Sequence, residues 1–219
     1  MDRALKWVPS WAALPPWGRW GFLAGAGLLL ALLIGGSGWY WWEWQQEAGQ
    51  TAFDQAFVLY RQAMVGGTPE LYAQAVRSLE GVTHKYPRHP VTLLAYYTLG
   101  NLHYRAREYG RAVMSFEQAV RTGRGDLQGM SQLGLGYSWE GQGDPARASA
   151  VYQDALKQRD AKDPHYGEFL LGMARTHIAM KRPAEAKELY ERFLRELPTA
   201  PQVEDVRTRL ASLEGARTP

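Results

Sequence analysis

The stretch YGRAVMSFEQAVRTGR, residues 109–124, contains the pattern that decides the fold. Its small residue Ala112 is followed four positions later by Phe116, and three positions after that by Ala119. Offsets of four and three place side chains on one face of an α-helix. The stretch therefore predicts a helix that packs a face of small and aromatic side chains against a neighbour.

Three further stretches repeat this pattern at a nearly constant distance along the chain. The small residue recurs at separations of 37, 36 and 38 positions. The matching stretches are YAQAVRSLEGVTHKYP with Ala75, PARASAVYQDALKQRD with Ala148 and PAEAKELYERFLRELP with Ala186. A bulky residue follows each of them by four positions, as Leu79, Tyr152 and Tyr190. Self-similarity at this period predicts stacked copies of one helical unit.

Each unit also contains a second predicted helix, upstream of the first. A pair with a small second residue lies twelve positions before the repeated alanine in three units, as Leu99-Gly100, Leu135-Gly136 and Met173-Ala174. In the first unit this helix comes from AFDQAFVLYRQAM, residues 52–64. Short breaks with the sequences RAREYG, GQGDPA and MKRPAE separate the two helices, and we expect Gly or Pro to end one helix and begin the next.

The order of Leu-Gly, Ala, aromatic, Ala and Pro in these units resembles the tetratricopeptide repeat, a pair of antiparallel helices in about 34 residues. The resemblance covers residues 52–198 and implies an all-α fold, with an α-solenoid of about four helical hairpins over residues 52–199. Residues 200–219 are expected to form a C-terminal capping helix and tail, with Val203, Val206 and Leu210 facing inward and Gly215 ending the helix. The family consists chiefly of protein-binding scaffolds, so the resemblance implies protein partners and no enzymatic activity.

The resemblance also implies where a partner binds, because the first helix of each pair lines the concave face in this family. The protein-binding residues implied by the family's spacing are Tyr97, Asn101, Tyr104, Tyr137, Glu140 and Arg175, with Leu133, Leu171 and Ile178 at neighbouring groove positions. Tyrosine suits such a groove because its ring gives a large contact area at low entropic cost. A competing interpretation is that several of these side chains only pack between repeats. The carboxylate clamp of chaperone-binding members is not expected, because Tyr97 stands where its first lysine belongs.

A different kind of segment precedes the repeats. Residues 20–42, WGFLAGAGLLLALLIGGSGWYWW, contain no charged side chain, and a helix of this length covers roughly 34 Å, enough to cross a bilayer core. Eight of the nine tryptophans lie before residue 45, and several of them lie at the two ends of this segment, where membrane interfaces attract aromatic rings: Trp17, Trp20, Trp39, Trp41, Trp42 and Trp44. The segment predicts a single transmembrane helix, and the alternative is a cleavable export signal.

The flanking charges give an orientation for this predicted span. Arg3, Lys6 and Arg19 precede it, whereas the first basic residue after it is Arg61. The positive-inside rule then leaves residues 1–19 as a short cytoplasmic tail and exports everything after residue 42. In a bacterium this corresponds to an inner-membrane protein with residues 43–51 as a juxtamembrane helix and the repeat domain in the periplasm. The GFLAG sequence at residues 21–25 has the spacing of a transmembrane helix contact, which allows a dimer through the span.

The composition argues against several other functions. Three of the 25 basic and one of the 22 acidic side chains lie within residues 1–20, so the exported part is nearly neutral and lacks the basic stripe that nucleic acid requires. The absence of cysteine excludes disulfides and cysteine-ligated zinc. No motif for a cofactor, a metal ion or a catalytic site was found. His103 and His177 fall at repeat positions that usually hold packing aromatics, which favours a structural role for both.

The layout of a basic tail, one span and an exported repeat domain resembles that of the ancillary subunits of the bacterial SecYEG translocon. This resemblance implies a membrane-anchored scaffold that assists protein export or envelope quality control, with the translocon or its exported clients as partners. The alternative hypothesis is a structural assembly factor for a cell-envelope or respiratory complex, which would contact that complex through the membrane helix.

Overall fold

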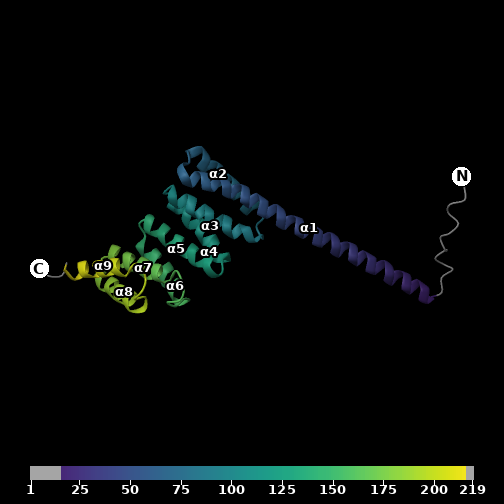
Figure 1. Ribbon diagram of the computed structural model, residues 1–219. Coiled ribbons are helices and arrows are strands. Elements are labelled where there is room, and N and C mark those ends of the chain that lie inside the picture. Colours follow the sequence, from purple (N-terminus) through teal and green to yellow (C-terminus); the bar gives the residue numbers. More distant parts are fainter. Residues whose placement is uncertain (1–15, 216–219) are drawn as a thin grey trace. The chain divides into compact units, whose positions relative to one another are not determined.

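The computed structural model describes the backbone of residues 16–215, and the side chains of this range except those of residues 16–23, 26, 38–43 and 45. This part of the chain is entirely α-helical, which confirms the predicted class (Figure 1). Its nine helices are α1 (Pro16–Gly66), α2 (Pro69–Lys85), α3 (Pro90–Arg105), α4 (Tyr109–Thr122), α5 (Gly125–Gly141), α6 (Pro145–Lys157), α7 (Tyr166–Ala179), α8 (Pro183–Glu196) and α9 (Val203–Gly215).

The helices from α3 onward are arranged as stacked hairpins. Helices α3 and α4, α5 and α6, and α7 and α8 pack together across turns of three residues each. Helix α5 also contacts α3 and α7, so the first helices of successive hairpins are neighbours. The last part of α1 supplies the first helix of the first hairpin, since Phe53 and Ala56 are buried there and α2 begins after a link of two residues. The predicted solenoid of about four hairpins is therefore confirmed.

The three turns inside the hairpins share one backbone conformation. Each contains a residue with positive φ, namely Arg107 at 61°, Gly143 at 81° and Lys181 at 58°. The N–H group of the next residue donates to a carbonyl five positions earlier in all three turns, over 2.8 to 2.9 Å. This is the hydrogen bond of a Schellman helix end, which favours glycine at the left-handed position. The expected glycine is present only at Gly143, and arginine and lysine adopt the same conformation in the other two turns.

The repeated small and aromatic residues form the core between hairpins. The four register alanines, Ala75, Ala112, Ala148 and Ala186, are completely buried. The ring of Phe116 lies so close to Gly100 and Gly134 that a Cβ atom at either glycine would approach it within 2.7 Å. Phe116 is thus held between a glycine of its own hairpin and a glycine of the next one. Glycine permits this spacing because it has no side chain to separate the helices.

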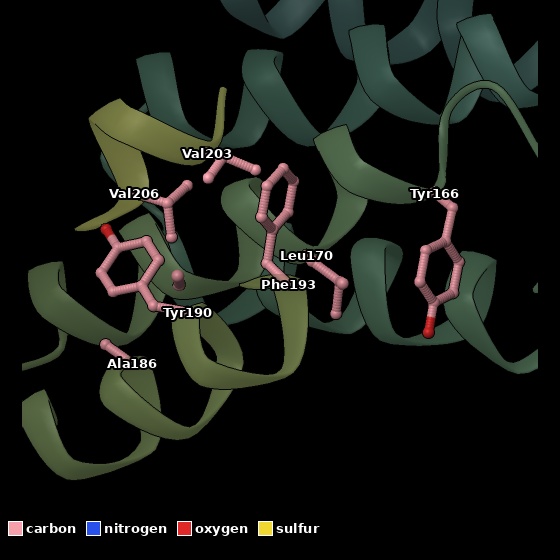
Figure 2. Close-up of a cluster of buried hydrophobic side chains, with 8 residues drawn as sticks. Tyr166, Leu170, Ala186, Tyr190, Phe193, Val203 and Val206 are labelled. Atoms are coloured by element: carbon pink, nitrogen blue, oxygen red, sulfur yellow. The ribbon is translucent and has the colours of Figure 1, made fainter. Parts of the chain in front are cut away.

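Helix α9 covers the end of the stack. Val203 and Val206 are buried in one cluster with Leu170, Tyr190 and Phe193. Figure 2 shows Val206 beside the ring of Tyr190 and Val203 beside the ring of Phe193. The predicted capping helix is therefore present, it ends at the predicted glycine, and residues 216–219 of the predicted tail lie outside the described residues.

Helix α1 runs without a break through the predicted span at 20–42 and the predicted juxtamembrane segment at 43–51. The chain divides into two compact units within this helix, Met1–Ala48 and Gly49–Pro219. Among the residues that the structure describes, no helix is both long and apolar enough to cross a membrane. The predicted membrane helix is thus not confirmed. Residues 1–15 of the predicted tail, and the side chains of residues 20–23, 26 and 38–42 of the predicted span, lie outside the described part.

Candidate protein-binding groove

Four of the six predicted binding residues line one cavity. Its volume is about 440 Å³, and it is lined by Tyr104 of α3, by Tyr137, Glu140 and Gly141 of α5, and by Arg175 of α7. Residues 137, 140 and 141 are three and four positions apart, so they lie on one face of α5. The cavity therefore lies along the first helices of three successive hairpins, as the repeat register predicts.

An ion pair between two hairpins forms one side of this cavity. Arg175 donates from Nε to Glu140 Oε2 over 3.1 Å and from Nη2 to Glu140 Oε1 over 3.0 Å. Burial alone would lower the pKa of Arg175, but the hydrogen bonds and the charge of Glu140 raise it above its ordinary value. The paired geometry matches a guanidinium to a carboxylate along two parallel bonds, which fixes the orientation of both side chains.

A buried tyrosine donates a hydrogen bond to the carboxylate of this ion pair. The hydroxyl of Tyr152 in α6 donates to Glu140 Oε1 over 2.5 Å, and the Tyr152 side chain is completely buried. Burial, followed by the charge of Glu140 and the hydrogen bond to it, raises the pKa of Tyr152. Tyr152 therefore stays protonated and acts as a donor that holds Glu140 against Arg175.

Tyr137 lies between the ion pair and a second carboxylate. Arg175 lies over its ring, with the guanidinium carbon 5.3 Å from the ring centroid, and its hydroxyl donates to Glu168 Oε2 over 3.1 Å. Burial, together with the charge of Glu168, raises the pKa of Tyr137 to about 12. Gln202, just before α9, donates from Nε2 to the other oxygen of Glu168 over 3.3 Å. The cavity is thus connected to the capping end of the stack.

Tyr104 is the most accessible aromatic side chain of the cavity, with 40% of the residue exposed. Its ring meets the ring of Tyr109 edge-on, at 5.6 Å between centroids. Partial burial raises the pKa of Tyr104, so its hydroxyl is protonated at neutral pH. Within the described residues this hydroxyl has no hydrogen-bond partner, which leaves it available to a bound molecule.

The other two predicted binding residues are not part of this cavity. Tyr97 packs its ring against Phe116 of the same hairpin, at 6.0 Å between centroids, and so takes part in the packing of a core cluster. Asn101 is half-buried on α3 and makes no side-chain hydrogen bond within the described part of the chain. Of the neighbouring positions, Leu133 is buried in the core, Leu171 packs against the last core cluster, and Ile178 is exposed.

The sequence did not identify three residues that shape the cavity. The repeat pattern predicts only a packing role for Tyr152, and it predicts no role for Glu168 or Gln202. A signal was present for Glu168, which lies on α7 seven positions before Arg175, two helical turns along the same face. No sequence pattern points to Gln202, because it reaches the site from the link between α8 and α9.

A second polar cluster lies between the first two hairpins. The hydroxyl of Tyr72 in α2 lies 2.8 Å from His103 Nδ1 and donates to Glu108 Oε2 over 2.7 Å. Burial lowers the pKa of His103, which is 4% exposed. The predicted structural role of His103 agrees with this position.

These observations define a helical repeat protein in which stacked hairpins expose a groove made by their first helices. Sequence profiles of the tetratricopeptide repeat match residues 70–126, 97–164 and 141–210. The chain therefore belongs to the tetratricopeptide repeat family. Membership implies protein partners, and nothing in the described residues points to catalysis.

One solved structure agrees with this fold. The chain resembles the crystal structure of a tetratricopeptide repeat protein from Parabacteroides merdae with a TM-score of 0.60 and 14% sequence identity, over 76% of this chain and 61% of that one. It therefore spans less than two thirds of that protein. A thermophilic tetratricopeptide repeat protein from Thermus thermophilus matches over 75% of this chain and 98% of its own, with 16% identity and a TM-score of 0.33. No curated protein sequence matches this chain.

Proposed function

We propose that this protein is a scaffold that binds a segment of another protein along α3, α5 and α7. The observation that carries this proposal is that Tyr104, Tyr137, Glu140 and Arg175 come from three helices and line one cavity. Each hairpin contributes a piece of the surface, so a ligand that fills the cavity contacts several repeats at once. Such extended surfaces are how helical repeat proteins bind their partners.

We further propose that residues 20–42 anchor this scaffold in a bacterial inner membrane, with the repeats in the periplasm. The uncharged composition of the segment, its aromatic ends and the basic residues before it support this topology. The apolar side chains of residues 28–30 and 32–34 are 61 to 69% exposed, a surface that a lipid environment would cover. Anchoring would raise the local concentration of the groove near membrane-bound partners.

The biological role that fits this topology best is assistance to protein export or envelope quality control close to the translocon. An exported protein leaves the membrane as an unfolded chain, which offers extended segments to a groove along α3, α5 and α7. The second candidate is an assembly factor for an envelope or respiratory complex, with the α1 segment as the contact. Its support is the exposed apolar surface of residues 28–34.

Photo-crosslinking in cells tests the proposal and separates the two roles. A crosslinking amino acid is placed at Tyr104 in the groove, at Leu29 in the anchor, or at Met114, a 66% exposed side chain of α4 outside the groove, as the matched control. Many exported proteins at Tyr104, together with translocon subunits at Leu29, would support the export scaffold. One stoichiometric partner at both positions would favour the assembly factor. Equal yields at Tyr104 and Met114 would refute the groove.

A further inference from the structure

The two parts of the repeat unit differ in charge. Residues 49–124 contain nine basic and five acidic side chains, whereas residues 125–219 contain 13 basic and 14 acidic ones. Among the nine basic side chains of the first part, only Arg111 forms an ion pair within the described residues, with Glu108. Eight of the twelve basic side chains in residues 125–215 are paired. The first part therefore carries the excess of positive charge.

Four of the unpaired side chains lie where successive hairpins are joined. Lys85 ends α2, and Arg88 lies in the link at residues 86–89. Arg121 lies in the last turn of α4, and Arg124 lies in the link at residues 123–124. Because a turn of three residues joins α3 to α4, the two helices are antiparallel, and the end of α4 lies beside the start of α3. The four exposed side chains therefore share one edge of the stack, which we call the link edge.

The chain enters the repeat unit at the same edge. The unit begins at Gly49, and a Cβ atom there would lie 2.7 Å from Cδ2 of His89, the last residue of the link between α2 and α3. Gly49 follows Trp42, the end of the proposed anchor, by seven positions. Seven residues reach at most about 25 Å, even when they are fully extended. The tether therefore keeps the link edge close to the surface of the membrane that holds the anchor.

We propose that the link edge binds the anionic lipid headgroups of this membrane, through Lys85, Arg88, Arg121 and Arg124. This inference rests on the proposed function and adds a second contact between the protein and the bilayer. Each basic side chain close to an anionic bilayer strengthens the attraction by roughly fivefold. Asp126 does not cancel this charge, because its Oδ1 lies 3.7 Å from Nε2 of His165, beside the following link. The contact holds the groove in one orientation over the membrane, whereas a tether alone would let the repeats swing.

Energy transfer in reconstituted vesicles tests this contact. The chain contains no cysteine, so a donor dye can be attached to T122C at the link edge or to A106C at the opposite edge, both at exposed positions. The full-length protein is placed in vesicles of phosphatidylcholine, alone or mixed equally with phosphatidylglycerol, with an acceptor dye on the headgroups. We expect phosphatidylglycerol to raise the transfer from T122C at least about twofold and to change that from A106C little. About 0.5 M NaCl should abolish the gain, because salt screens exposed charges.

Charge variants identify the side chains responsible. K85Q/R88Q/R121Q/R124Q should lose the gain in transfer, whereas the charge-preserving K85R/R88K/R121K/R124K should keep it. The matched control R61Q/R105Q/R107Q/R182Q removes four exposed, unpaired arginines that lie away from the link edge, and it should also keep the gain. Urea unfolding of each variant confirms that it is folded.

Two results would overturn the inference. Equal transfer in both kinds of vesicle would leave an acidic protein, and not the bilayer, as the partner of this edge. Equal losses in the two glutamine variants would show that only the total charge matters. Retention of the wild type on vesicles after the salt wash judges the proposed anchor separately, and failure to remain bound would refute the anchor and this inference together.

Discussion

Replacing Gly136 by alanine should destabilise the stack through one identifiable clash. Tyr152 of α6 is completely buried between Gly136 of α5 and Gly172 of α7. A Cβ atom at position 136 would lie 2.1 Å from Cε1 of Tyr152, and one at position 172 would lie 2.7 Å from its Cε2. The ring cannot move aside easily, because a glycine borders each side and its hydroxyl is bonded to Glu140 over 2.5 Å.

The size of the effect follows from two opposing contributions. Overpacking a dense core costs about 1–3 kcal/mol. Replacing a helical glycine by alanine returns about 0.5–1 kcal/mol, because the unfolded chain loses freedom. We therefore expect Gly136→Ala to lower the free energy of unfolding by about 0.5–2 kcal/mol. Gly81 of α2 is the matched control, since it is exposed and a Cβ there would have no neighbour within 4 Å. Gly81→Ala should raise stability by about 0.5–1 kcal/mol.

Urea unfolding of the full-length protein, followed by circular dichroism, measures both effects under the same conditions. A second substitution, Tyr152→Leu, removes the ring that causes the clash. In the double variant Gly136→Ala with Tyr152→Leu, the alanine should therefore cost less than it does alone. If Gly136→Ala stabilises the protein as much as Gly81→Ala does, the close packing of Tyr152 against Gly136 is wrong.

Three further predictions concern the turns and the polar clusters. Arg107→Gly should raise the free energy of unfolding by about 0.5–1 kcal/mol, because glycine adopts positive φ without strain, whereas Gly143→Ala should lower it by about 1 kcal/mol. If urea unfolding shows that Gly143→Ala stabilises the protein and Arg107→Gly destabilises it, the positive φ assigned to these turns is wrong. Tyr152→Phe should lower the free energy of unfolding by about 1–2 kcal/mol, because Glu140 loses a hydrogen-bond donor. In a double-mutant cycle with E140Q, the double variant should lose less stability than the two single variants lose together. Simple additivity would show that the two side chains do not interact. Burial lowers the pKa of His103 in the folded state, so the unfolded chain binds more protons near pH 6, and the free energy of unfolding should fall as the pH drops from 7.5 to 5.5. In urea titrations at these two pH values, His103→Gln should reduce the difference in the free energy of unfolding. An unchanged difference would exclude His103 as its source.

The repeat architecture could be predicted because its signal is local and periodic. The separations of 36 to 38 residues between buried alanines such as Ala112 and Ala148 are visible in the chain. When a small residue is followed by bulky residues at helical spacing, few arrangements other than a packed helix bury all of these side chains on one face. Once the register is known, positions on neighbouring first helices correspond, which is why Tyr104 and Arg175 were both assigned to one groove.

Contacts between successive hairpins could not be predicted from the same pattern. Gly134 and Gly172 each receive an aromatic ring from the preceding hairpin, but the relevant offset depends on how the hairpins stack in space. The packing of Tyr97 against Phe116 could not be predicted for a related reason, because a tyrosine four positions before Asn101 can face either the groove or the core. The left-handed conformation of Arg107 and Lys181 could not be predicted from the sequence, because neither residue type favours positive φ.

The way the stack ends also determines where the array can grow. Tyr152 fits between glycines on both sides, and an inserted copy of α5 and α6 would carry the same glycines to receive the ring before it. Tyr190 instead lies beside Val206 of the capping helix. A hairpin added after α8 would have to displace α9 and expose Val203 and Val206 to water. Lengthening by internal duplication is therefore compatible with this core, whereas extension at the carboxyl end requires a new cap.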